Sequence, residues 1–197
     1  MKVIKVICTL FIFGFVSVSH AAVIFITEKD ANGVTSLLGA DNVEVNGLFY
    51  NVRFLDGTCI ALFNGCDASE DFLFGTLEDA QAASESLLTQ VFPDGSFFGS
   101  IPEYTYGCSW LYACEVFTTY DVTNGDAIQA FYTRIELPFD NFIYDYPHME
   151  WDDDTTVDTM RVFAVWSEPV EASAPGTAML LLMGIAGLLV SQRRKQA

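Results

Sequence analysis

Residues 43–54 read VEVNGLFYNVRF. Short runs of residues that favour strands lie on both sides of the dipeptide Asn46-Gly47. Asn-Gly is the dipeptide most typical of a type I′ turn, whose two central residues both need a positive φ. The segment therefore predicts an antiparallel hairpin that joins strands 43–45 and 48–54.

The chain on either side of this hairpin predicts more sheet. Asp56-Gly57 predicts another turn, followed by a short strand over 58–63. A second Asn-Gly dipeptide at 124–125 predicts a hairpin over 118–135, and the alternating segment 159–166 predicts a closing strand. The aromatic and acidic stretch 144–151 is interpreted as a loop.

One helix is predicted, over residues 76–92. Thr76 can cap it, Asp79 lies in its first turn, and Pro93 stops it. Its apolar residues recur every three or four positions, which gives one stripe that can pack on a sheet. The expected fold class is α+β: mostly antiparallel sheet with one main helix packed on it, two local disulfides and a C-terminal transmembrane helix.

Residues 1–21 have the features of a secretory signal peptide. Lys2 and Lys5 precede an apolar run over 6–18, and small residues lead up to a cut between Ala21 and Ala22. Cleavage after Ala22 fits equally well. Residues 22–168 are then expected to form one extracytoplasmic domain.

Four cysteines remain in that domain, which is an even number in a chain expected to be exported. They allow three pairings, of which we favour the two local ones, Cys59–Cys66 and Cys108–Cys114. A metal site is the alternative, but neither pair has C-x-x-C spacing and His148 is the one histidine available to it.

The C-terminal end has three parts. After a linker over 169–173 come Ala174-Pro175-Gly176, an apolar run to residue 190, and the cations Arg193, Arg194 and Lys195. Residues 172–190 would make a helix of about 28 Å, against about 30 Å for a bilayer core. The tail over 174–197 is therefore expected to cross a membrane, with its cations held on the cytoplasmic side.

This three-part tail resembles the PEP-CTERM sorting domain of Gram-negative bacteria, with Ala-Pro in place of the usual Pro-Glu-Pro. Residues 43–88 also resemble the bodies of other proteins that carry such tails. The resemblance implies an exosortase-type processing enzyme as a partner and a precursor anchored in the inner membrane. The product would then reach the cell surface or an exopolysaccharide matrix, where exopolysaccharide is a candidate partner.

The body is strongly acidic. All 26 Asp and Glu residues follow the signal segment, and only four Lys or Arg residues lie between that segment and the tail. Such a surface repels phosphate backbones, so nucleic acid is excluded as a partner.

No catalytic motif is evident. His148 is the single histidine after the signal segment, and no Gly-x-Ser-x-Gly sequence accompanies it. The acids are so numerous that a carboxylate pair for glycoside hydrolysis carries little information. A secreted hydrolase that uses a carboxylate pair is therefore kept as an alternative function, ranked after the two described below.

Two further sets of residues could bind ligands. Asp152, Asp153, Asp154 and Asp158 are weak candidates for calcium, because the run lacks the spacing of an EF-hand loop. The following aromatic residues could stack on sugar rings: Phe97, Tyr104, Trp110, Tyr112, Tyr144 and Trp151. The function expected first is an exported surface or matrix protein without catalytic activity or a cofactor. The second is an extracellular module that binds carbohydrate or calcium.

Overall fold

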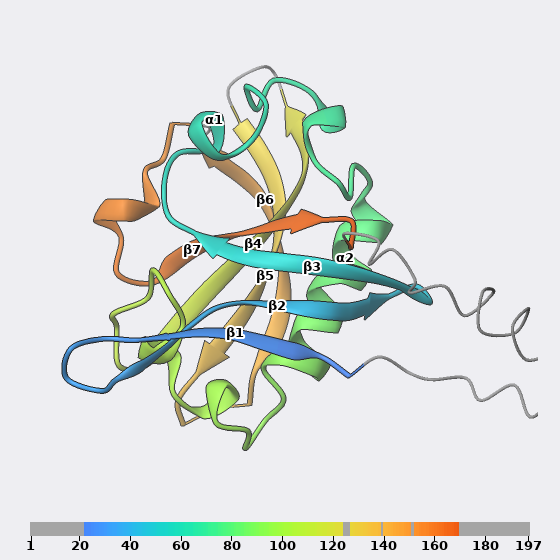
Figure 1. Ribbon diagram of the computed structural model, residues 1–197. Helices are drawn as coiled ribbons and strands as arrows, with labels where there is room; N and C mark the ends of the chain where they lie inside the picture. Colours follow the sequence, from blue (N-terminus) through green and yellow to red (C-terminus); the bar gives the residue numbers. More distant parts are fainter. Residues whose placement is uncertain (1–21, 124–126, 139, 151, 170–197) are drawn as a thin grey trace, which may run out of the picture.

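The computed structural model describes residues 22–123, 127–138, 140–150 and 152–169, which form one seven-stranded sheet with the order β1-β2-β3-β7-β4-β5-β6 (Figure 1). Neighbouring strands are antiparallel except β4 and β7, which are parallel. The strands are β1 Ile24–Lys29, β2 Thr35–Val45, β3 Leu48–Leu55, β4 Ala113–Thr123, β5 Ala127–Glu136, β6 Phe142–Glu150 and β7 Arg161–Ser167.

The predicted hairpin at Asn46-Gly47 is confirmed. Val45 pairs with Leu48, and both turn residues have a positive φ, 51° for Asn46 and 81° for Gly47. The second hairpin is confirmed as β4 and β5, and the closing strand as β7.

The main helix is also confirmed, as α2 Leu77–Ser86 followed by a π-helical turn, Leu87–Val91. The Thr76 hydroxyl accepts from the Asp79 amide at 3.2 Å, so Thr76 is the N-cap. Ala80, Ala83 and Leu87 are fully buried, and they belong to the larger core cluster, which lies on one face of the sheet.

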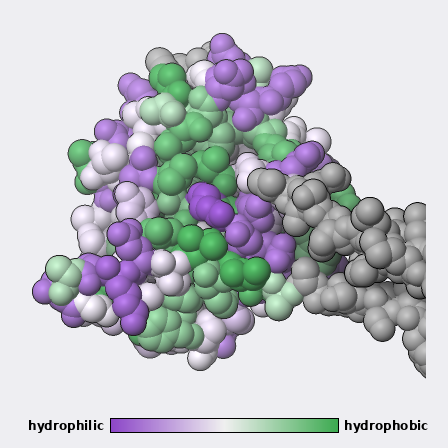
Figure 2. All heavy atoms as spheres, in the orientation of Figure 1, coloured by the Kyte–Doolittle hydropathy of each residue, from purple (hydrophilic) through white to green (hydrophobic). Residues whose placement is uncertain are grey.

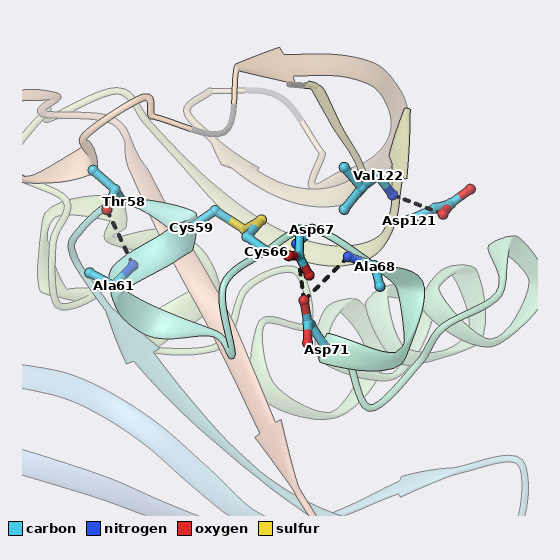
Figure 3. The surroundings of a disulfide bond; sticks show 9 residues. All are labelled: Thr58, Cys59, Ala61, Cys66, Asp67, Ala68, Asp71, Asp121 and Val122. Atoms are coloured by element: carbon cyan, nitrogen blue, oxygen red, sulfur yellow. Dashed lines mark hydrogen bonds between the residues drawn. A yellow bond between two sulfur atoms is a disulfide. The ribbon is translucent and has the colours of Figure 1, made fainter. Parts of the chain in front are cut away.

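The predicted strand over 58–63 is wrong, because the chain forms a single helical turn there, α1 Cys59–Leu62. Thr58 accepts from the Ala61 amide through its side chain (Figure 3). A threonine that caps the next residues favours a helical turn over extended backbone, and this local bond outweighs the apolar run. The turn belongs to the second core cluster, which packs against the other face of the sheet.

Three further strand segments were not predicted. The stretch interpreted as a loop over 144–151 is largely the edge strand β6, and β1 and the first half of β2 precede the predicted hairpin. β6 pairs with β5 through Tyr132–Tyr144 and Arg134–Phe142. Its acidic residues resemble a loop in sequence because an edge strand with one open face tolerates charge.

Both predicted disulfides form. Cys59 bonds with Cys66, and Cys108 bonds with Cys114. Four further helical turns of 3-10 type connect the elements: Ser69–Asp71, Phe98–Ser100, Pro102–Tyr104 and Thr155–Val157.

Among the described residues, no helix has the length and apolar character needed to cross a bilayer. The signal segment through Ala21 lies outside the described residues, and so do the tail residues Ala174, Pro175, Gly176, Arg193, Arg194 and Lys195. Ala22 is the first described residue, and it is exposed.

The sheet has two distinct ends. β1 begins and β7 ends on the same side of the molecule (Figure 1). The loops at 105–112 and 152–160 lie together on the opposite side, where the amides of Ser109 and Trp110 both donate to the Thr159 carbonyl. In the same orientation, the space-filling view shows hydrophobic residues from the top to the bottom of this face, interrupted by hydrophilic residues near its centre (Figure 2).

Candidate functional site

Aromatic side chains gather on the face of β5 and β6 that lies away from α2. We define this aromatic face as Tyr132 of β5 with Phe142, Tyr144 and Tyr146 of β6. Residues two apart on a strand share a face, and directly paired residues do as well. The Tyr132 ring lies 5.7 Å from Tyr144 and 6.1 Å from Tyr146, measured between centroids.

Phe117 of β4 lies beside Tyr132 on the same face of the sheet, because the two residues pair directly. It is fully buried, and its ring lies 5.5 Å from Tyr132 and 5.7 Å from Tyr146. Phe163 of β7 packs against Phe117 in turn, at 6.4 Å. The outer side remains open, since 58% of Tyr144 is exposed. The rings are therefore fixed on one side and accessible on the other.

A charged network borders the aromatic face. Arg134 of β5 donates to Glu115 of β4 at 2.6 Å, and its Nε lies 2.8 Å from a Glu136 carboxylate oxygen. Arg161 of β7 lies 3.5 Å from Glu115 and 3.4 Å from Asp158. Strand pairing explains the convergence, because Glu115 is opposite Arg134 in β5 and opposite Arg161 in β7.

The network and the rings are in contact. The guanidinium carbon of Arg161 lies 5.9 Å from the centre of the Tyr146 ring, which is within the range of a cation–π interaction. Burial raises the pKa of Tyr132, and the nearby Glu115 raises it further, so its hydroxyl stays protonated and can donate. For Arg134, burial acts to lower the pKa, but Glu136 and Glu115 outweigh it and raise that pKa, which keeps the guanidinium charged.

A polar pocket of about 320 Å³ adjoins Arg161. Asp153, Asp154, Asp158 and Thr159 contribute to its lining. Three of the four aspartates proposed for calcium therefore line this pocket, while Asp152 is exposed outside the lining. Within the described ranges, however, no three His, Cys, Asp or Glu side chains are arranged to hold a metal ion.

Local bonds explain why these carboxylates do not converge. Asp154 accepts from both the amide and the hydroxyl of Thr156, and the hydroxyl bond is the first cause of its lowered pKa. Asp158 accepts from the Met160 amide and pairs with Arg161. The pocket thus already contains a cationic side chain.

The loop closed by Cys108–Cys114 is the third part of this end of the molecule. Trp110, Leu111 and Tyr112 are all substantially exposed on it. The Tyr112 carbonyl accepts from the Leu137 amide, just beyond β5, and Trp110 is bonded to the pocket residue Thr159. The loop is therefore attached to the residue just after β5 and to the segment just before β7, and it leads directly into β4.

The other residues singled out in the sequence lie elsewhere. His148 belongs to β6. Phe97 and Tyr104 pack on each other at 5.4 Å, in the connection between the main helix and β4. Trp151 lies outside the described residues. Of the proposed sugar-stacking residues, Tyr144 is the one on the aromatic face.

Sequence reasoning missed Glu115, Arg134 and Arg161. One signal was available for the first two: a two-residue turn at 124–125 places residue 115 opposite residue 134. Nothing comparable indicated Arg161, because its partner strand β4 lies far away in the sequence and runs parallel to β7.

Comparison of the chain with family models, with curated proteins and with solved structures finds no match.

Proposed function

We propose that this protein is an exported cell-surface or matrix protein whose body binds carbohydrate through the aromatic face. The observation that carries this proposal is the group of rings at Tyr132, Phe142, Tyr144 and Tyr146, open on one side and bordered by charged hydrogen-bonding groups. Export itself is supported by the sequence of both ends and by the two disulfides.

The chemistry of a sugar suits this surface. One side of a pyranose ring presents C–H groups, which pack well on an aromatic ring, while its hydroxyls need donors and acceptors at the edge. Tyr144 and Tyr146 supply the rings. Arg134 and Glu136 supply donors and acceptors in fixed positions, because each already has a partner.

Preorganisation also favours binding. Strand pairing and the packing of Phe117 hold Tyr132 and Tyr146, so little side-chain freedom is lost when a ligand binds. A polymer can add contacts along β6, whose outer edge has no neighbouring strand in the described sheet. The proposal is therefore a binding module, without a chemical step.

Glycan arrays and affinity electrophoresis of the purified body, residues 22–169 with the disulfides intact, test the binding proposal. We expect Tyr144→Ala to weaken retention by an immobilised polysaccharide on the order of tenfold, equivalent to about 1.4 kcal/mol. Tyr106→Ala is the matched control, since Tyr106 is 43% exposed and lines a different pocket, with Glu28 and Ser36. Equal retention of both variants and the unaltered body would contradict the proposed site.

The tail carries the second part of the proposal. We propose that residues 174–197 hold the precursor in the inner membrane until an exosortase-type enzyme cuts near Ala174 to Thr177. Mass spectrometry of the mature protein tests this directly. A C-terminus between these residues supports sorting, whereas an intact end with Arg193, Arg194 and Lys195 would indicate an ordinary membrane anchor.

A further inference from the structure

We infer that the aromatic face selects uncharged polysaccharides and discriminates against anionic ones such as polyuronates. This inference rests on the proposed carbohydrate binding and specifies its ligand class. It follows from the charge balance of the groups beside the rings.

Both guanidinium groups beside the rings are already neutralised. Arg134 is shared between Glu115 and Glu136, at 2.6 and 2.8 Å, and Arg161 between Glu115 and Asp158, at 3.5 and 3.4 Å. Three carboxylates therefore surround two guanidinium groups, and the net charge beside the rings is negative.

The described body has no spare cation nearby to recruit. Its other two basic side chains, apart from histidine, are Lys29 on β1 and Arg53 on β3. Arg53 already pairs with Asp41 at 2.7 Å. β1 lies at the opposite edge of the sheet from β6, so Lys29 is remote from the aromatic face.

An anionic sugar would have to compete for a guanidinium that Glu115 holds. The Glu115 side chain is only 8% exposed, so losing an arginine would leave a nearly buried carboxylate without its partner, which is costly. Asp153, Asp154 and Asp158, which line the pocket next to Arg161, would repel the incoming anion as well.

A neutral sugar avoids both costs. Its hydroxyls can donate to the outer lone pairs of Glu136 and accept from N–H groups of Arg134 without separating the ion pair. The rings then provide the stacking surface whatever the charge of the polymer. The charged network thus discriminates against anionic sugars, whereas the aromatic rings beside it do not discriminate by charge.

The test compares each neutral polymer with its own carboxymethyl derivative: dextran with carboxymethyl-dextran, and hydroxyethyl cellulose with carboxymethyl cellulose. Affinity electrophoresis of the body at low salt should show binding at least about tenfold weaker for a carboxymethyl form than for its neutral parent. The difference should shrink as salt is added, because the repulsion is screened.

A variant sharpens the test. Glu136→Gln removes one carboxylate from Arg134 and should narrow the ratio between neutral and carboxymethyl polymers. The variant Tyr106→Ala should leave that ratio unchanged. Equal or tighter binding of the carboxymethyl form by the unaltered body overturns the inference and leaves carbohydrate binding intact. Absence of binding to every polymer, neutral and charged, would overturn both this inference and the proposed function.

Discussion

Glu115 of β4 and Arg134 of β5 face each other across the central hairpin, with 2.6 Å between Oε1 and Nη1. The carboxylate is nearly buried, and a second arginine, Arg161, approaches its other oxygen. Removing one member of such an ion pair leaves the other charge without a partner at a partly buried site.

Glu115→Gln should therefore lower the stability of the body. We expect a loss of about 2 kcal/mol, below the range for fully buried pairs because both arginines are partly exposed. Thermal unfolding monitored by circular dichroism measures this change. The control is Asp41→Asn, which removes the partner of Arg53 from a more exposed pair and should cost less than about 1 kcal/mol. Equal losses in the two variants would show that burial of Glu115 has no energetic role.

For the hairpin of β4 and β5, the sequence predicts the pairing register over part of its length. A two-residue turn at Asn124-Gly125 predicts the pairs Glu115–Arg134 and Thr119–Ala130, and both are observed. Beyond Thr119 the register shifts by one residue, so Asp121 pairs with Gln129. A bulge of this kind leaves no clear mark in the sequence, because it depends on the packing of both strands.

The long-range contacts were beyond sequence reasoning. The aromatic face needs β6 beside β5, yet residues 144–150 read as an acidic loop. Arg161 reaches Glu115 only because β7 inserts between β3 and β4. Local turn signals and caps could be predicted, including the Thr76 cap and the positive φ of Asn46, whereas the order of strands in the sheet depends on burial of the whole core.

Asn141 joins the end of β5 to the segment that follows the main helix. Its amide nitrogen Nδ2 donates to the carbonyls of Phe92 and Gly99, at 3.0 and 2.8 Å, and its Oδ1 accepts from the Glu136 amide at 3.1 Å. Asn141 is buried, so Asn141→Ala leaves these groups without partners, and we expect a loss of about 3 kcal/mol. Urea unfolding of the body measures this loss.

Asn141→Asp is the companion variant. It keeps an acceptor for the Glu136 amide but loses both donors to the carbonyls, so it should also destabilise strongly at neutral pH. A loss below about 0.5 kcal/mol for either variant would contradict the assignment of Asn141 as a structural junction.

Asp71 stabilises the segment that follows Cys66. Its Oδ2 accepts from the amides of Asp67 and Ala68, at 3.0 and 3.3 Å (Figure 3). The bond from Asp67 is the first cause of the lowered pKa of Asp71, whose ordinary value is 3.8. The contribution to stability is therefore present above pH 3.8 and is lost as the pH falls through the lowered pKa.

Asp71→Asn should speed hydrogen exchange at the Asp67 and Ala68 amides at neutral pH, because a neutral acceptor binds them less strongly. The neighbouring Glu70→Gln, whose carboxylate accepts only from the exposed Ser69 hydroxyl among the described contacts, serves as the control. Exchange rates that do not distinguish the two variants would show that the carboxylate of Asp71 does not order this segment.

Asp56 should give a pH dependence of the opposite sign. Burial raises its pKa above 3.8, the bond from the Thr155 hydroxyl at 3.2 Å opposes this, and the charge of Asp154 adds to the rise. A carboxyl group with a raised pKa in the folded state favours folding below pH 3.8, and this contribution is lost as the pH rises through the folded-state pKa.

Asp56→Asn removes the charge and keeps an acceptor for Thr155. The melting temperature of the variant minus that of the unaltered body should therefore be larger at pH 7 than at pH 3. Thermal melts of both proteins at these two values measure the difference, with Asp154→Asn as the control of opposite sign, because the pKa of Asp154 is lowered by the bonds from Thr156. A relative melting temperature of Asp56→Asn that falls between pH 3 and pH 7 would contradict the raised pKa.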